Sequence, residues 1–149
     1  MGNTSELFIV YLAGTTGMWK GIPAGIALGV HPGYNGFFTA LGSVTSVLIL
    51  YFAGDTFRAW VLNKYGQKRI EKKKGRFKKF ADRYGPMGLG LITTGLLGPF
   101  NSLLLGFILI TNIRKFLFYL IAGIFIWSFI LSYTFTPIVE LISAIKINF

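Results

Sequence analysis

The sequence of 149 residues contains no cysteine, one histidine and only five acidic residues. Without cysteine the chain cannot form a disulfide, and with His31 alone it lacks a His and Cys set for a metal site. His31 lies in a His-Pro-Gly turn, which does not favour a catalytic triad, and no glycine-rich phosphate loop is present. We therefore expect no enzymatic activity and no cofactor.

Charged residues are also few, and hydrophobic residues make up more than half of the chain. Only 13% of the residues are charged, whereas 53% are hydrophobic and 17% aromatic; about 25% charged is usual in soluble domains. Three stretches contain no charged residue, namely 21–54, 84–113 and 116–139. Each exceeds the roughly 20 residues that span a bilayer as a helix. These features predict an all-α integral membrane protein.

The net charge of +10 is concentrated in one segment. Residues 58–83 hold eleven Lys and Arg against two acids, and a basic cluster between hydrophobic segments faces the cytoplasm. Phe77, Phe80 and Tyr84 follow at helical spacing, so this loop could lie on the membrane with its cations against anionic lipid. A solvated loop that only fixes orientation is the alternative, and we do not expect nucleic acid as a partner. The residues expected to contact anionic lipid are Lys72, Lys73, Lys74, Arg76, Lys78 and Lys79.

Gly98-Pro99 divides the uncharged stretch 84–113. Its two arms, 85–97 and 100–113, are each about 20 Å long as helices, which is less than the roughly 30 Å of bilayer hydrocarbon. Because proline suits the first residue of a helix, we predict a re-entrant hairpin that enters and leaves by the same face. A full span over 116–136 would follow.

The first half of the chain has a similar order of features. Thr-Thr-Gly, Pro and Leu-Gly occur in that order in both halves, with spacings that differ by one or two residues, and the span of the first half would be 37–57. Since one charged loop separates the halves, the second would be inverted relative to the first, as in many transporters. Four or five ordinary spans, with 5–31 as one helix broken at Pro23, are the alternative.

The predicted fold is therefore a single membrane domain, 1–149, with two inverted repeats, each a re-entrant helical hairpin followed by a transmembrane helix. We expect a multi-pass protein of the plasma membrane, with both termini outside and 58–83 in the cytoplasm. Its parts are repeat one, 4–57; the basic loop, 58–83; repeat two, 84–136; and a C-terminal tail, 137–149.

The hairpin tips form the predicted binding site. Helices would begin at the midplane near Pro23 and at Pro99, where unpaired N–H groups and the helix dipole attract anions. Lys20 would add a positive charge, and Asn101 and Ser102 would add neutral donors. The anion site therefore comprises Lys20, Pro23, Pro99, Asn101 and Ser102. Four threonines would either line a polar path or donate to carbonyls of their own helix, namely Thr15, Thr16, Thr93 and Thr94.

Glycines at 17, 21, 25, 29 and 33 form a stripe with a spacing of four residues. Such a stripe lets another backbone approach closely. It indicates either the seam of a homodimer or tight packing inside one chain.

The run Gly21–Gly29, with the order Gly-Ile-Pro-Ala-Gly-Ile-Ala-Leu-Gly, resembles a segment of the small multidrug export protein family, which is related to the DedA/VTT membrane proteins. Arg83-Tyr84-Gly85 is similar to the entry to the second half of that family. The resemblance implies a DedA-like fold and movement of lipid-linked phosphates or other lipids across the bilayer. Gly17 and Trp19 stand where that family has a glutamate and an arginine, with Lys20 one place along.

We therefore predict a transporter or scramblase for an amphipathic anion, such as a polyprenyl phosphate or a phospholipid, with the head group bound between the hairpin tips. The expected partners are membrane lipid, a lipid-phosphate substrate and a second copy of the chain. The alternatives are a secondary exporter of small drugs, or a non-transporting scaffold that recruits anionic lipid through its basic loop.

Overall fold

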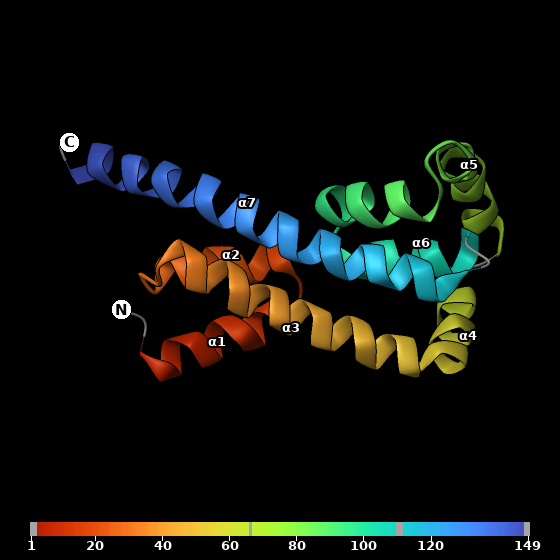
Figure 1. Ribbon diagram of the computed structural model, residues 1–149, viewed down its shortest axis with the longest axis horizontal. Helices are drawn as coiled ribbons and strands as arrows, with labels where there is room; N and C mark the ends of the chain where they lie inside the picture. The colour runs from red at the N-terminus through yellow and green to blue at the C-terminus, as the bar shows by residue number, and fades with distance from the viewer. Residues whose placement is uncertain (1–2, 66, 110–111, 148–149) are drawn as a thin grey trace. The chain divides into compact units, whose positions relative to one another are not determined.

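The computed structural model describes residues 3–65, 67–109 and 112–147, and every regular element in these ranges is an α-helix (Figure 1). This agrees with the all-α prediction. The helices are α1 (Thr4–Thr15), α2 (Met18–Ala27), α3 (Pro32–Phe52), α4 (Gly54–Tyr65), α5 (Gln67–Leu97), α6 (Pro99–Leu109) and α7 (Ile113–Ile147).

The chain divides into two compact units, which are described separately. Unit 1 contains Met1–Thr45 and Phe125–Phe149, and unit 2 contains Ser46–Ile124. The long helices α3 and α7 each contribute one part to unit 1 and the other part to unit 2.

Proline and glycine set several of the helix boundaries. Helix α3 begins at Pro32, and the backbone N–H of Gly33 donates to Nδ1 of His31 at 3.2 Å, so that His31 caps the helix. Helix α6 begins at Pro99, as predicted. Helix α5 is interrupted at Gly85, where φ is 62°, and a second helical segment continues from Pro86 to Leu97.

In unit 1, α1 and α2 pack against each other as a helical hairpin, which we call hairpin 1. Close contact with α3 depends on glycine: a Cβ on Gly14 would lie 2.6 Å from the carbonyl oxygen of Thr39. Met18 and Ile22 form one buried apolar cluster of the unit together with Leu131 of α7, and Ile26 and Trp127 pack against it. Hairpin 1 is thus held between α3 and the second part of α7.

In unit 2, the segment Pro86–Leu97 packs against α6, and we call this pair hairpin 2. A Cβ on Gly90 would lie 2.9 Å from the backbone nitrogen of Leu120, and one on Gly123 would lie 2.9 Å from the carbonyl oxygen of Gly90. The side chains of Leu89, Leu103, Phe116 and Leu120 are fully buried. Hairpin 2 therefore packs closely on the first part of α7.

Two of the five glycines in the stripe of residues 17 to 33 pack closely inside the chain. A Cβ on Gly21 would lie 2.7 Å from Cγ2 of Thr39, and one on Gly25 would overlap with the amide group of Asn35. These glycines therefore face α3, as the alternative of packing inside one chain required. Gly17 and Gly29 have positive φ angles of 127° and 70°, so they serve as turn residues.

Two segments differ from their predicted form. The segment 58–83, predicted as a loop, is helical in its described residues: 58–65 belong to α4, and 67–83 belong to α5 before Gly85. The predicted tail 137–149 belongs to α7 as far as Ile147, because Pro137 lies inside that helix and does not end it. The hydroxyl of Thr136 donates to the carbonyl of Ser132 at 2.7 Å, one turn earlier.

Two of the described helices are long and apolar enough to cross a bilayer, α3 over Pro32–Phe52 and α7 over Ile113–Ile145. At 1.5 Å per residue α3 is about 30 Å long, which equals the usual hydrocarbon thickness. The predicted spans, 37–57 and 116–136, overlap with these helices but place their ends differently.

Candidate functional site at the two helix breaks

The break in hairpin 1 lies at Gly17. This residue has φ 127° and ψ 149°, a conformation that only glycine adopts readily. The backbone N–H groups of Lys20 and Gly21 both donate to the Gly17 carbonyl, at 3.1 Å each, and so begin α2. The first N–H groups of α2, before Lys20, lack partners within the helix.

The prediction that a helix begins at Pro23 is wrong. Pro23 lies inside α2, which begins at Met18. A proline inside a helix removes one hydrogen bond but keeps a helical φ, so α2 continues through it. Of the predicted site residues, Pro23 is therefore separated from the helix start, whereas Lys20 lies in the first turn.

The break in hairpin 2 lies at Gly98, where φ is 85°. Its N–H donates to the carbonyl of Thr94, and its own carbonyl accepts from the N–H of Ser102, both at 3.1 Å. Pro99 is the first residue of α6, so the second predicted break is confirmed.

The two breaks share one set of spacings. Eight residues after Gly17 comes Gly25, and eight after Gly98 comes Gly106. A Cβ on Gly25 would overlap with Asn35, and one on Gly106 would overlap with Phe116, ten residues further along in each case. Counted from Gly17 and Gly98, these glycines and their contacts therefore fall at equal spacings, whereas the Thr-Thr-Gly pattern aligned Gly17 with Gly95.

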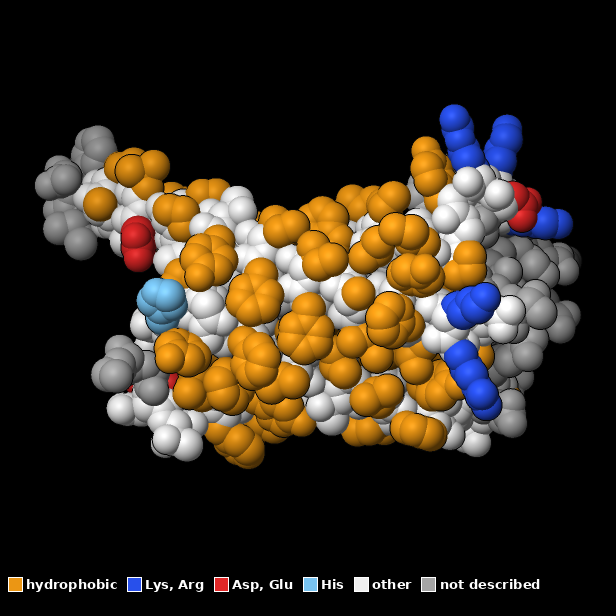
Figure 2. Space-filling view, in the orientation of Figure 1, with side chains coloured by type: hydrophobic (Ala, Val, Ile, Leu, Met, Phe, Trp, Pro, Cys, Tyr) orange, Lys and Arg blue, Asp and Glu red, His pale blue; other side chains and the backbone are white. Residues whose placement is uncertain are grey.

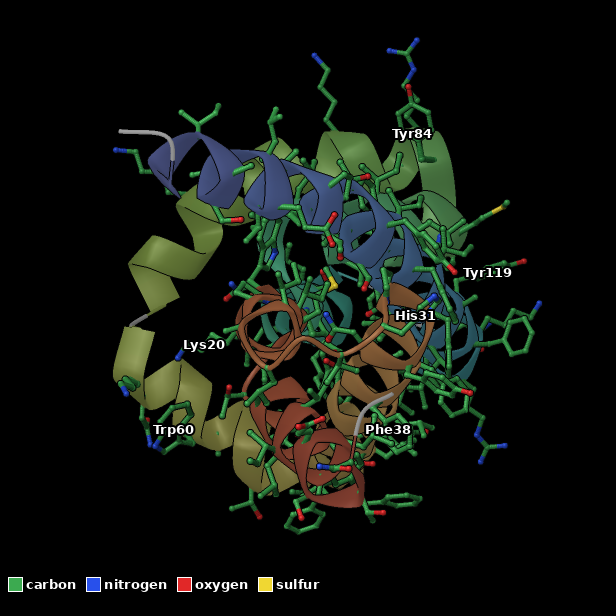
Figure 3. All side chains as sticks on the ribbon, turned by 90° about the vertical axis from the view of Figure 1, so that its left-hand side faces the viewer. Lys20, His31, Phe38, Trp60, Tyr84 and Tyr119 are labelled. Atoms are coloured by element: carbon green, nitrogen blue, oxygen red, sulfur yellow. The ribbon has the colours of Figure 1, made fainter. Side chains whose placement is uncertain are left out.

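Lys20 and Asn101 occupy the same place relative to the two breaks, three residues after the break glycine, and both are exposed. Figure 3 shows the Lys20 side chain directed away from α2. Trp19 beside it is 49% exposed, and Phe100 holds the corresponding place in hairpin 2. Each break is thus followed by an aromatic residue and then by a hydrogen-bond donor, which is charged only in hairpin 1.

The two other polar residues of α6 have different surroundings. Asn101 donates from Nδ2 to the carbonyl of Leu97 at 2.8 Å, so its amide secures the end of α5. Ser102 is fully buried, and its hydroxyl has no hydrogen-bond partner among the described residues. Asn101 therefore retains its second Nδ2–H and its Oδ1 for a further contact.

All four predicted threonines donate to carbonyls of their own helix. Thr15 donates to Leu12 at 2.6 Å and Thr16 to Ala13 at 2.7 Å. Thr93 and Thr94 donate to Leu89 and Gly90, and both side chains are buried. Of the two expectations for these threonines, the structure therefore shows hydrogen bonding to carbonyls of the same helix.

A row of buried polar side chains on α3 was missed by the sequence analysis. Asn35, Thr39 and Ser43 recur every four residues and are completely buried. Asn35 donates from Nδ2 to the carbonyl of Ile22 at 3.0 Å, and Ser43 donates to the carbonyl of Gly14 at 2.9 Å. Their spacing was the available signal, but Asn35 lies before 37–57, the predicted span of the first half.

The six residues that were expected to contact anionic lipid all belong to α5. Lys72, Lys78 and Lys79 are exposed on α5. The side chains of Lys73, Lys74 and Arg76 lie outside the described part of the structure.

Comparison with known proteins gives one family. Residues 18–130, more than half of the chain, match the profile of a family described as "Putative small multi-drug export protein". No curated protein and no solved structure matches the chain. The matched region contains Lys20, Asn101 and the Gly98 break, and the family together with α3 and α7 indicates a membrane protein. The chain therefore belongs to the small multidrug export protein family.

Proposed function

We propose that this protein exports small amphipathic molecules across the membrane and that Trp19 and Lys20, in the first turn of α2, contact the substrate. The observation that carries the proposal is the placement of an exposed lysine directly after a helix break, within the region that matches an export family. Trp19 would cover an apolar part of the substrate, while Lys20 would attract a negative charge.

The distribution of charge favours neutral or anionic substrates. There is no acidic residue between Glu6 and Asp55 or between Asp82 and Glu140. A cationic drug would therefore find no carboxylate in α2, α3, α6 or hairpin 2. Lys20 and the N–H groups at the start of α2 instead offer positive charge to an anion.

The finer architecture of the prediction is part of this proposal. We infer two repeats, hairpin 1 with α3 and hairpin 2 with α7, each hairpin re-entrant and the two oppositely oriented in the membrane. The common glycine spacings support the repeat, and the single basic segment between the halves supports the inversion. A relation to the DedA/VTT proteins would follow.

A test uses everted membrane vesicles from cells that express the chain, with fluorescent anionic and cationic amphiphiles as probes. Lys20→Ala should reduce uptake of the anionic probe by about tenfold or more, since a charge contact in a low-dielectric setting is lost, and Lys20→Arg should retain it. Lys115→Ala, which removes an exposed lysine in unit 2, is the matched control. Unchanged uptake by Lys20→Ala would refute the site, and no uptake of any probe by the parent would refute export.

A second candidate, translocation of lipid-linked phosphates, is favoured by the exposure of Trp19 and Lys20. Because both side chains are exposed on unit 1, a head group could reach Lys20 while its alkyl chain stays in lipid. Reconstituted liposomes with a fluorescent polyprenyl phosphate distinguish the candidates, because only this second function equilibrates the lipid between leaflets. Equilibration equal to that of protein-free liposomes would exclude it.

A further inference from the structure

The charge of the molecule is divided unequally between its two units. Unit 2 contains thirteen of the fifteen Lys and Arg residues and three of the five acids, so the entire net charge of +10 belongs to it. Unit 1 has two residues of each sign. A separate role in electrostatic binding would therefore belong to unit 2, whereas Lys20 belongs to unit 1.

Most of this charge lies on α4 and on α5 before Gly85, which we call the basic surface. Its described cations are exposed, namely Lys64, Lys72, Lys78, Lys79 and Arg83. Helices α4 and α5 contact each other, and Figure 2 shows Lys and Arg side chains gathered where α4, α5 and the start of α7 lie. A helical scaffold holds these cations at the surface of the unit.

Two half-exposed aromatic residues accompany the cations. Trp60 is 50% exposed, and Nζ of Lys64 lies 4.6 Å from its ring centroid. Tyr84 is also 50% exposed, with the Arg83 guanidinium carbon 5.8 Å from its ring centroid. Trp and Tyr prefer the head-group level of a bilayer, where Lys and Arg extend their charged ends towards phosphate. The pairs thus suit a membrane interface.

Both ends of the basic surface join apolar elements directly. Helix α3 ends at Phe52, and α4 begins two residues later at Gly54. A Cβ added to Gly54 would lie 3.7 Å from the ring of Phe107 in α6, which belongs to the same unit. At the other end, the apolar arm of hairpin 2 starts immediately after Gly85. No long linker separates the cations from the membrane helices, which favours lipid over a nucleic acid as the partner.

We propose that the basic surface docks on the anionic lipid head groups of the bilayer, with Trp60 and Tyr84 as interfacial anchors. The partner is identified by charge complementarity: many cations on two helices face a layer of phosphates. Each cation near an anionic surface should change the docking equilibrium about fivefold. The docking does not depend on transport or on Lys20.

The test places a nitroxide spin label on α4. Asn63→Cys introduces one cysteine into a chain that has none, at an exposed position next to Lys64. Collisional accessibility to a water-soluble nickel complex is compared in phosphatidylcholine bilayers and in bilayers that also contain phosphatidylglycerol. We expect the label to be shielded in the anionic bilayers, and high salt should reverse the shielding. Equal accessibility in both bilayers would overturn the proposal.

Charge variants separate the contribution of the cations from that of the fold. Replacing Lys64, Lys72, Lys78 and Lys79 with Gln should weaken docking by roughly several hundredfold and restore accessibility, whereas replacing the same four with Arg should preserve shielding. The comparison of low and high salt uses no charge substitution, so it tests electrostatic docking even if the Gln variant does not fold. Shielding that persists in a folded Gln variant would refute the docking, and shielding by added nucleic acid with no response to lipid would assign a different partner. Neither result depends on the uptake activity of Lys20→Ala.

Discussion

The side chain of Asn35 on α3 donates a hydrogen bond to the main-chain carbonyl of Ile22 on α2 at 3.0 Å, in the interior of unit 1. The Oδ1 atom of Asn35 accepts from Thr39 at 3.3 Å, so both ends of the amide are used. One helical turn beyond Thr39, Ser43 donates to Gly14 of α1. Hairpin 1 is therefore joined to α3 by hydrogen bonds on both sides of the Gly17 break.

Asn35→Ala should lower the free energy of unfolding by about 1–2 kcal/mol, because hydrogen bonds between side chains in membrane proteins contribute about 0.6 and at most about 1.7 kcal/mol each. Unfolding in mixed micelles of a mild detergent and dodecyl sulfate would measure the change. Asn63→Ala, at an exposed asparagine inside α4, should change stability little. Equal stability of Asn35→Ala and the parent protein would show that the buried amide does not hold hairpin 1.

A coupling between Gly25 and Asn35 follows from the same geometry. Gly25→Ala should destabilise the protein, since the added Cβ would overlap with the Asn35 amide, and overpacking of this kind costs about 1–3 kcal/mol. In the Asn35→Ala background the same substitution should cost less, because the obstructing atoms are gone. A double-mutant cycle measures the difference. Strict additivity would contradict the contact.

In the repeat that we propose, Phe116, Leu120 and Gly123 stand where α3 has Asn35, Thr39 and Gly42. Hairpin 2 packs on α7 through buried apolar side chains, whereas hairpin 1 contacts α3 through buried polar ones. A comparison of residue types alone does not detect this equivalence, because asparagine and phenylalanine share no chemistry. It depends instead on which positions are buried, and burial is a property of the packed chain.

The sequence predicted the all-helical class and the break at Gly98-Pro99, but it placed Lys20 before a helix break and not after one. It placed the first break at Pro23, because proline removes a helix hydrogen bond. The backbone turns at Gly17, where φ is 127°. Proline is compatible with a helical φ, whereas residues with a Cβ rarely adopt a φ of 127°. Glycine was therefore the better indicator of the helix break. The start of α3 was also misplaced. The helix begins at Pro32, five residues before the predicted start of the span at 37.

Gly17→Ala and Gly98→Ala should each destabilise the protein by about 1–3 kcal/mol, because both glycines have positive φ angles, 127° and 85°, that strain other residues. No neighbouring atom lies within 4 Å of an added Cβ at Gly17, so crowding does not contribute there. Gly75→Ala is the control: it has the same open space but a helical backbone. This control should gain about 0.5–1 kcal/mol. Equal effects at 17 and 75 would contradict the turn.

Pro23 and Pro99 should respond to alanine with opposite signs, because one lies inside a helix and the other begins one. Pro23 is exposed within α2, where proline is up to about 3 kcal/mol less favourable than alanine. Pro23→Ala restores an N–H that can donate to the carbonyl of Trp19, so it should raise the free energy of unfolding by about 1–3 kcal/mol.

Pro99→Ala should instead lower the free energy of unfolding by about 0.4–1 kcal/mol. The first residue of a helix needs no internal N–H partner, and proline there restricts the unfolded chain. Both changes are measured by the same detergent unfolding assay, with circular dichroism to confirm helix content. If Pro23→Ala destabilised the protein as Pro99→Ala does, α2 would begin at Pro23 after all. Lys20 would then precede a helix, and the lysine contact proposed for the first turn of α2 would lose its structural basis.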